Sequence, residues 1–240
     1  MLEIDNLSKF YGQKQVLHGI SFSLGPGDIC AFIGSNGAGK TTTIKSALGL
    51  IPFDDGHILI DGHDIETDPL EAKRVYSYVP DNPELYSFMR GIDYLNFIAD
   101  IFELDYDTRK ERIDALAEDF QIFDRLGESI ENYSHGMQQK LALIGALLHR
   151  PKLIVLDEPF VGLDPLATRM IREHFKRMAR EHAATILFST HVLEVAEKLC
   201  NKVAIIRDGR LVFFGATKDI LEKGSLEDLF VERMSSDVDA

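Results

Sequence analysis

The sequence predicts an α/β fold with a mainly parallel sheet, antiparallel strands at the N-terminus and an inserted α-helical subdomain. Short apolar segments alternate with helical segments before residue 83 and again after residue 150. The first 24 residues alternate apolar and polar side chains with the period of a strand, whereas residues 83–150 show helical spacing throughout. Short apolar strands that alternate with helices are typical of a parallel sheet.

Each element is expected from its local pattern and the turn residues that bound it. Two strands are predicted within 2–24, as a hairpin that turns at Gly12. Further strands are predicted at 28–34, 57–62, 75–80, 152–157, 184–189 and 202–215. Helices are predicted from Lys40 to about Gly49, from Pro69 for a short length, through 83–150, and at 165–181, 192–200 and from 225 onward. Asp68 is expected to cap the short helix that begins at Pro69.

These elements are expected to form one domain, residues 1–240. Its α/β core would comprise residues 1–82 and 151–224, and the helical subdomain residues 83–150. A C-terminal helix and a polar tail would follow at 225–240. No strand signal interrupts the helical segment, which is therefore interpreted as an insertion into the core.

Composition restricts the class of protein. The chain carries 26 Lys and Arg against 39 Asp and Glu, a net charge of −13, which opposes non-specific binding to nucleic acid. Cys30 and Cys200 are far apart, so we expect two buried thiols in a reducing, cytosolic setting. The longest apolar run, 141–148, is well short of the roughly 20 residues of a spanning helix. We expect a soluble protein whose link to any membrane is a partner.

A glycine-rich segment after the predicted strand 28–34 matches the phosphate-binding P-loop pattern, which indicates a P-loop NTPase core. Glycine lets phosphate oxygens approach the backbone, and backbone N–H groups at a helix N-terminus form an anion site. Lys40 would reach the β- and γ-phosphates, and the Thr41 hydroxyl would ligate Mg²⁺. The predicted nucleotide-binding residues here are Gly34, Ser35, Asn36, Gly37, Ala38, Gly39, Lys40, Thr41 and Thr42.

Three further side chains are expected at the edge of the sheet where phosphates would lie. Asp157 follows the apolar strand 152–157 and would hold the Mg²⁺ shell. Glu158, one residue on, would activate a water for attack on the γ-phosphate. His191 follows the strand 184–189 and would donate to a γ-phosphate oxygen. With Lys40, Glu158 and His191 form the predicted catalytic set.

The motifs and their order resemble those of the ATP-binding subunit of an ABC transporter. Residues 34–42 resemble the family's Walker A loop, and 153–159 its Walker B strand with the catalytic glutamate. Asp164 lies in a segment similar to the D-loop, and His191 resembles the switch histidine. The resemblance covers nearly the whole chain and implies an ATPase that uses ATP and Mg²⁺.

The segment 133–140 lies where this family carries its LSGGQ signature. Ser134 and Gly136 match that motif, whereas Tyr133, His135 and Met137 depart from it. Ser134 would cap the following helix, whose N-terminus would be a second anion site. The resemblance implies that two subunits, alike or different, pack head to tail, so that the P-loop of one and the signature of the other enclose each ATP.

Three nucleotide or metal contacts are expected with alternatives left open. Tyr11 matches the family's adenine-stacking aromatic, although an aromatic in the core of the hairpin is the other interpretation. Val16 would add an apolar contact to the nucleotide or pack in the core. Asp81 occupies the position of the family's Q-loop glutamine, where it would reach the metal shell or only cap a turn.

The resemblance also implies a role at a membrane. We expect the chain to power a separate transmembrane permease from the cytoplasmic face, and the YSHGM form of the signature favours an exporter. The apolar segment Pro83 to Met89 would either form a groove for a permease helix or be buried. The alternative function is a soluble ABC ATPase switch on nucleic acid or the ribosome, which the acidic charge opposes. A P-loop kinase or GTPase would account for Lys40 but not for Ser134, Glu158 and His191 together.

Overall fold

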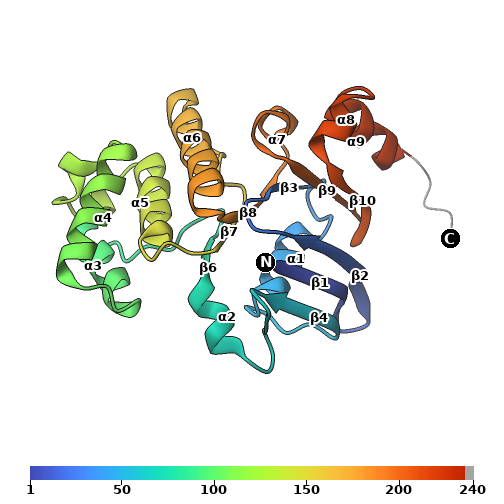
Figure 1. Ribbon diagram of the computed structural model, residues 1–240, viewed down its shortest axis with the longest axis horizontal. Coiled ribbons are helices and arrows are strands. Elements are labelled where there is room, and N and C mark those ends of the chain that lie inside the picture. The colour runs from blue at the N-terminus through green and yellow to red at the C-terminus, as the bar shows by residue number, and fades with distance from the viewer. Residues whose placement is uncertain (236–240) are drawn as a thin grey trace.

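The computed structural model describes residues 1–235 and contains two sheets that lie side by side (Figure 1). The smaller sheet is antiparallel and has the strand order β2-β1-β4-β5. Its strands are β1 (Leu2–Tyr11), β2 (Lys14–Leu24), β4 (Asp55–Ile60) and β5 (His63–Asp64). The hairpin expected to turn at Gly12 is therefore present.

The larger sheet carries the functional edge and has the order β10-β9-β3-β8-β7-β6. Its strands are β3 (Ile29–Ile33), β6 (Tyr76–Val79), β7 (Leu153–Leu156), β8 (Thr185–Thr190), β9 (Lys202–Arg207) and β10 (Arg210–Ala216). All neighbours are parallel apart from β10, which pairs with β9 as an antiparallel hairpin. The predicted mainly parallel sheet is confirmed.

Helices cover the larger sheet and gather at one end of the molecule, where α3, α4 and α5 lie together (Figure 1). The helices are α1 (Lys40–Ala47), α2 (Pro69–Val75), α3 (Gly91–Ile101), α4 (Tyr106–Asp119), α5 (His135–Leu147), α6 (Pro165–His182), α7 (Leu193–Leu199), α8 (Thr217–Leu221) and α9 (Leu226–Ser235), with short 3-10 turns at Phe123–Arg125 and Ile130–Asn132. Residues 83–150 contain helices and turns and no named strand. No helix within residues 1–235 has the length and apolar character needed to cross a bilayer.

Asp68 is the N-cap residue of α2 and Pro69 lies in its first turn, as expected. The backbone carbonyl of Asp68 accepts the N–H of Ala72, but the Asp68 side chain accepts no hydrogen bond from the helix. The carboxylate instead lies 2.7 Å from Nδ1 of His63, because β5 brings that imidazole within reach. The polar residues 236–240, predicted as part of a tail, lie outside the described residues.

The two faces of the larger sheet support two apolar clusters. Along β3, Ile29, Ala31 and Ile33 belong to one cluster, and Cys30 and Phe32 to the other, as the two-residue period of a strand requires. All five are buried, which is typical of a central strand with both faces covered. Both predicted buried thiols are found.

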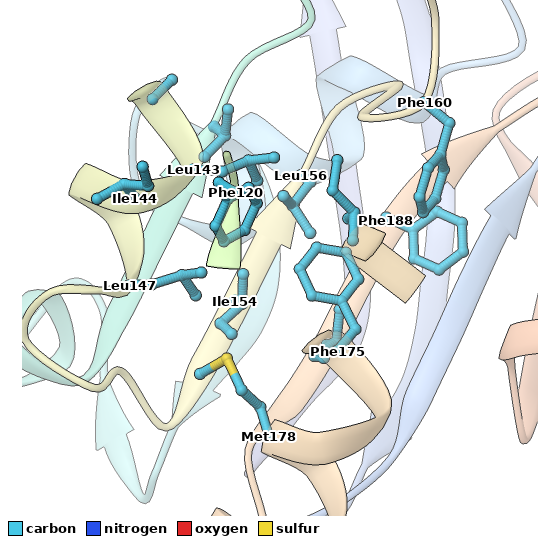
Figure 2. Packing of buried hydrophobic residues seen from close by; sticks show 14 of the residues in the cluster. Phe120, Leu143, Ile144, Leu147, Ile154, Leu156, Phe160, Phe175, Met178 and Phe188 are labelled. Carbon is cyan, nitrogen blue, oxygen red and sulfur yellow. The ribbon is translucent and has the colours of Figure 1, made fainter. Parts of the chain in front are cut away.

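The larger cluster joins α4, α5 and α6 to the sheet. Figure 2 shows Phe175 of α6 between Ile154 of β7 and Phe188 of β8. On the other side, Phe120 and Leu143 pack toward Leu156. Each such side chain contributes about 1.5–3 kcal/mol when fully buried. The helical region is therefore held to the strands that carry the functional residues.

The half-buried side chain of His149 lies in surroundings that disfavour its charged form. The His149 ring stacks on Phe102, with 3.6 Å between the ring centroids, and burial lowers the pKa of His149 from 6.5 to about 4. In the unfolded chain this ring binds a proton at a higher pH than in the folded chain. The stability that it contributes is therefore complete above pH 6.5 and is lost as the pH falls toward 4.

We expect His149→Phe, which retains the ring stack, to weaken the pH dependence of stability. Lowering the pH from 7.5 to 5 should reduce the free energy of unfolding by about 2 kcal/mol less in this variant than in the wild type. Urea denaturation at the two pH values measures the difference. Equal pH dependence in the two proteins would show that His149 is not held neutral by the fold.

Candidate functional site

The P-loop connects β3 to α1 and is shaped by glycines. Gly37 and Gly39 have φ values of 81° and 107°, a left-handed region that other residues rarely adopt. At Gly34, a Cβ would lie only 2.5 Å from the carbonyl oxygen of Ile206 on β9. Ser35, Asn36 and Gly37 are exposed, so the loop forms an accessible rim over the first turn of α1. A loop of this kind presents backbone N–H groups to an anion.

Lys40 lies at the first position of α1 and is 7% exposed. Its Nζ donates to the carbonyl oxygen of Gly34 at 2.8 Å and to that of Ser35 at 3.2 Å. No carboxylate of residues 1–235 forms an ion pair with this ammonium group. A buried lysine is costly unless its charge is compensated. The loop therefore holds a positive charge that is available to a phosphate.

A chain of hydrogen bonds joins the P-loop helix to the ends of β7 and β8. The Thr41 hydroxyl donates to Oδ2 of Asp157 at 2.6 Å, and the Ser189 hydroxyl donates to Oδ1 of the same carboxylate. Ser189 Oγ in turn accepts the backbone N–H of Glu158 at 2.9 Å. Residues from three separate segments are thus fixed relative to one another.

Ser189 was not among the residues predicted from the sequence. It is fully buried at the end of β8, which lies between β3 and β7 in the sheet. The signal available in the sequence was a hydroxyl pair, Ser189 and Thr190, at the end of an apolar strand. Buried hydroxyls generally have a hydrogen-bond partner, so a polar residue at this edge indicates a contact with the adjacent strand ends.

Glu158 and His191 face each other at the edge of this network. Glu158 Oε2 lies 3.1 Å from Nδ1 of His191, and the carboxylate is largely shielded whereas the imidazole is 60% exposed. Glu158 has a φ of 49°, the left-handed region that is uncommon for residues with a side chain. This conformation turns the chain sharply immediately after Asp157, and backbone strain of this kind is concentrated at functional sites.

The donor set suits Mg²⁺ bound together with a phosphate. Mg²⁺ in nucleotide sites usually has one or two protein ligands, and water and phosphate oxygens supply the rest. Thr41 and Asp157 provide one hydroxyl and one carboxylate at hydrogen-bond distance from each other. Residues 1–235 contain no cluster of three His, Cys, Asp or Glu side chains that would hold a metal without a phosphate.

Asp81 lies near this site but bonds locally. Its exposed carboxylate accepts the backbone N–H of Asn82 at 2.9 Å, which is the turn-capping alternative. Burial, together with the charges of Asp157 and Asp81, raises the pKa of Tyr78. Both carboxylates are therefore close enough to this phenol to disfavour its ionisation. A role for Asp81 in the metal shell stays a prediction.

The predicted nucleotide contacts of the hairpin lie at its end nearest the P-loop. Tyr11, the last residue of β1, is 55% exposed, so it is not part of the hairpin core. Val16 is half-buried, and its carbonyl group lies against Gly209, which donates its N–H to the carbonyl of Ala38. Adenine stacking by Tyr11 stays a prediction, because no contact of residues 1–235 tests it.

The signature residues lie at the start of α5. Ser134 caps the helix by accepting the backbone N–H of Met137 at 3.3 Å, as expected. Ser134 and His135 are exposed, and Gly136 and Met137 are half-buried. Within residues 1–235, no side-chain hydrogen bond or ion pair connects these four residues to the P-loop. One chain therefore carries two separate helix N-termini with exposed polar groups.

Asp164 lies at the start of α6, at the end of the loop that follows Glu158. It caps α6 by accepting the backbone N–H of Ala167 at 2.8 Å. The preceding Gly162 contacts the signature, because a Cβ at this glycine would lie 3.1 Å from Cδ2 of His135. The loop from Glu158 to Asp164 therefore runs from the P-loop network to the tip of α5.

Comparison with known proteins agrees with this geometry. The family model described as "ABC transporter" matches residues 17–161. An uncharacterized ABC transporter ATP-binding protein of Bacillus subtilis, YhcH, is 36% identical over 219 residues, which is 91% of this chain and 71% of that protein. The linearmycin resistance ATP-binding protein LnrL of Bacillus subtilis is 34% identical over 223 residues, 93% of this chain and 71% of that protein.

A solved structure described as the ATP-binding subunit of an ABC transporter superimposes over nearly the whole chain. Its TM-score is 0.93 at 34% sequence identity, and the match covers 98% of this chain and 100% of that one. Similarity of fold and sequence thus extends over both the α/β core and the helical region. The chain belongs to the ABC transporter ATP-binding proteins, which are ATPases.

Proposed function

We propose that this chain is the ATP-hydrolysing subunit of a membrane transporter and that two copies, or one copy and a related subunit, close head to tail around ATP. The observation that carries the proposal is the hydrogen-bonded chain Thr41–Asp157–Ser189–Glu158 directly behind the P-loop. In this proposal the hydrogen bonds support a metal-binding pair, Thr41 and Asp157, and a general base, Glu158, beside the γ-phosphate.

In this proposal the triphosphate binds along the P-loop rim. Backbone N–H groups of residues 34–42 would surround the phosphate oxygens, and Lys40 would exchange its two carbonyl contacts for the β- and γ-phosphates. Tyr11 would stack on adenine, since its ring is exposed at the end of the hairpin closest to the loop. Val16 would add an apolar contact there.

Glu158 is the proposed general base. Its carboxylate would accept a proton from the attacking water, and a fixed base contributes about 10²- to 10⁴-fold to a rate. His191, in contact with Glu158, would orient that carboxylate and donate to the γ-phosphate. Thr41 and Asp157 would hold Mg²⁺, which supplies charge neutralisation on the phosphates when bound.

The dimer is proposed because the chain has a second exposed helix N-terminus that is separate from its own P-loop. Ser134, His135, Gly136 and Met137 surround the N-terminus of α5 and make no side-chain contact with the P-loop of the same chain among residues 1–235. A helix N-terminus with a capping serine favours anions. Pairing it with the P-loop of a neighbour gives both sites one shared ligand.

The membrane partner and the direction of transport complete the proposal. We infer a transmembrane permease as the partner, with the chain held at the cytoplasmic face, and an exporter as the assembled transporter. The relative LnrL is named for resistance to linearmycin, a role that an exporter would serve. Leu85 and Pro83, from the segment predicted to meet the permease, line a groove, whereas Phe88 is 80% exposed outside it.

A soluble switch that acts on nucleic acid or the ribosome is less well supported. Such binding depends on positive charge that neutralises phosphates, and the chain has a net charge of −13. The P-loop itself would serve either function, so the partner decides between them.

Glu158→Gln should bind ATP, hydrolyse it at least about 100-fold more slowly and accumulate as a dimer, because the amide keeps the shape of the side chain but accepts no proton. Size-exclusion chromatography with and without Mg-ATP measures the dimer, and phosphate release measures the rate. Ser134→Arg in the same background is the control, because a bulky side chain at the tip of α5 should prevent dimerisation while ATP still binds. A Glu158→Gln protein that stays monomeric in Mg-ATP contradicts the head-to-tail arrangement.

Lys40→Ala should weaken ATP binding by about tenfold or more, because a charge-assisted hydrogen bond contributes roughly 1.5–3 kcal/mol. Calorimetric titration of ATP into the protein measures the dissociation constant. Lys223→Ala, which removes an exposed lysine beyond α8, should leave that constant unchanged. Equal affinity of Lys40→Ala and wild type would remove Lys40 from the proposed phosphate site.

A further inference from the structure

The end of β1 departs from the regular pattern of a strand at Lys9. The side chain of Lys9 is buried, whereas the next two residues, Phe10 and Tyr11, are both exposed. In a regular strand, consecutive side chains point to opposite faces, so two adjacent exposed rings require an irregularity. The pairing with β2 provides it, because the register shifts between Lys9 and Phe10. The irregular strand end therefore buries an ammonium group two residues before the ring that is expected to meet the nucleotide.

Asp54, which immediately precedes β4, holds this strand end in place. Its Oδ2 lies 3.1 Å from Nζ of Lys9 and accepts the backbone N–H of Phe10 at 2.7 Å. The backbone N–H of Asp54 donates to the carbonyl oxygen of Ser8 at 2.9 Å. The N–H of Phe10 and the ammonium group of Lys9 lower the pKa of Asp54, so this carboxylate is ionised at neutral pH. One residue thus fixes three consecutive residues of β1.

The ion pair with Asp54 does not explain why Lys9 is buried. The Asp54 side chain is 42% exposed, so a lysine could reach it from solvent, whereas the Lys9 side chain is only 9% exposed. Nζ of Lys9 lies over the ring of Tyr11, 5.4 Å from its centroid, a distance at which the π electrons of the ring attract a cation. Within residues 1–235, Phe10 has no contact of this kind. The ammonium group therefore distinguishes Tyr11 from the other exposed ring.

The contact with Lys9 changes the open face of the Tyr11 ring. Tyr11 is exposed although the ammonium group lies over one face of its ring. The π electrons make both faces of an aromatic ring negative, which disfavours face-to-face stacking on another ring. A cation over one face attracts these electrons and so reduces the repulsion at the opposite face. Lys9 therefore restricts the orientation of the ring and makes its open face more favourable for an aromatic base.

We propose that Lys9 and Asp54 are positioning residues for the nucleotide base and that both act through Tyr11. Asp54 holds the strand end in the arrangement that exposes the Tyr11 ring, and Lys9 orients that ring and reduces the negative charge on its open face. The inference rests on the proposed function, in which Tyr11 stacks on adenine. It adds that the affinity for the base depends on two residues behind the stacking ring. Their loss should weaken recognition of the base and not of the phosphates.

The test compares Mg-ADP with Mg-pyrophosphate, which has the same two phosphates without ribose or base and which, like ADP, avoids hydrolysis of ATP during the measurement. Calorimetric titration into the full chain gives both dissociation constants, and the pyrophosphate constant divided by the ADP constant is the base preference. Lys9→Met removes the charge and keeps an unbranched side chain. It should lower the base preference about threefold or more and leave the pyrophosphate constant within about twofold of wild type. Asp54→Ala should lower the base preference in the same way.

Three further variants separate this role from a general effect on charge or folding. Lys9→Arg should retain the base preference, because a guanidinium group also pairs with a carboxylate and lies over an aromatic ring. Lys14→Met is the matched control, because it removes the same charge from an exposed lysine opposite Tyr11 on β2, and it should also retain the preference. Lys9→Met combined with Tyr11→Ala should have the same preference as Tyr11→Ala alone, since Lys9 acts through the ring. A further decrease in the double variant would contradict the inference.

The inference is overturned if Lys9→Met or Asp54→Ala keeps the wild-type base preference, if Lys14→Met lowers it equally, or if Lys9→Arg does not retain it. Loss of both ligands in Lys9→Met would show that Lys9 supports the fold as a whole, which overturns the inference as well. A lower preference in Tyr11→Ala but not in Lys9→Met rejects this inference alone. An unchanged preference in Tyr11→Ala would instead count against the stacking of Tyr11 on adenine in the proposed function.

Discussion

The geometry of the site depends on the hydrogen bonds that one buried carboxylate accepts. Asp157 is 3% exposed, and its two oxygens accept hydrogen bonds from hydroxyls on different elements, Thr41 of α1 and Ser189 of β8. An ionised carboxylate without partners would be strongly destabilising at this depth. Since both donors come from outside β7, satisfying the charge also fixes the P-loop helix and the two strand ends relative to one another. The functional geometry is thus a consequence of a stability requirement.

Local motifs were predictable because each one is specified by adjacent residues. The P-loop, the strand before Asp157 and the cap at Ser134 all depend on residues within a few positions of one another. Ser189 was not predictable in this way, because its role arises from the order β3-β8-β7. Sequence order gives no direct indication that the strand of residues 185–190 lies between the other two. Non-local topology, and not local propensity, placed the hydroxyl beside Asp157.

Strand register explains a second feature that the sequence did not predict. The alternation of apolar and polar residues does not decide which of Phe10 and Tyr11 faces inward. The pairing of β1 with β2 is irregular, with register shifts between Ile4 and Leu7, between Leu7 and Lys9, and between Lys9 and Phe10. Each irregularity breaks the two-residue period on which the prediction depends. Both aromatic rings are exposed as a result.

The loop after Glu158 gives the two anion sites a mechanical connection within one chain. Glu158, where the loop begins, has a left-handed backbone, and its N–H donates to Ser189. Phe160 packs edge to face on Phe188, with 5.4 Å between the ring centroids. Asp164, at the other end of the loop, caps α6. Between these anchors Gly162 lies against His135 at the tip of α5. Gly162 has a φ of 75°, and a side chain at this position would be strained and would press on the His135 ring. The segment that follows the proposed base of one nucleotide therefore contacts the helix tip that would meet another.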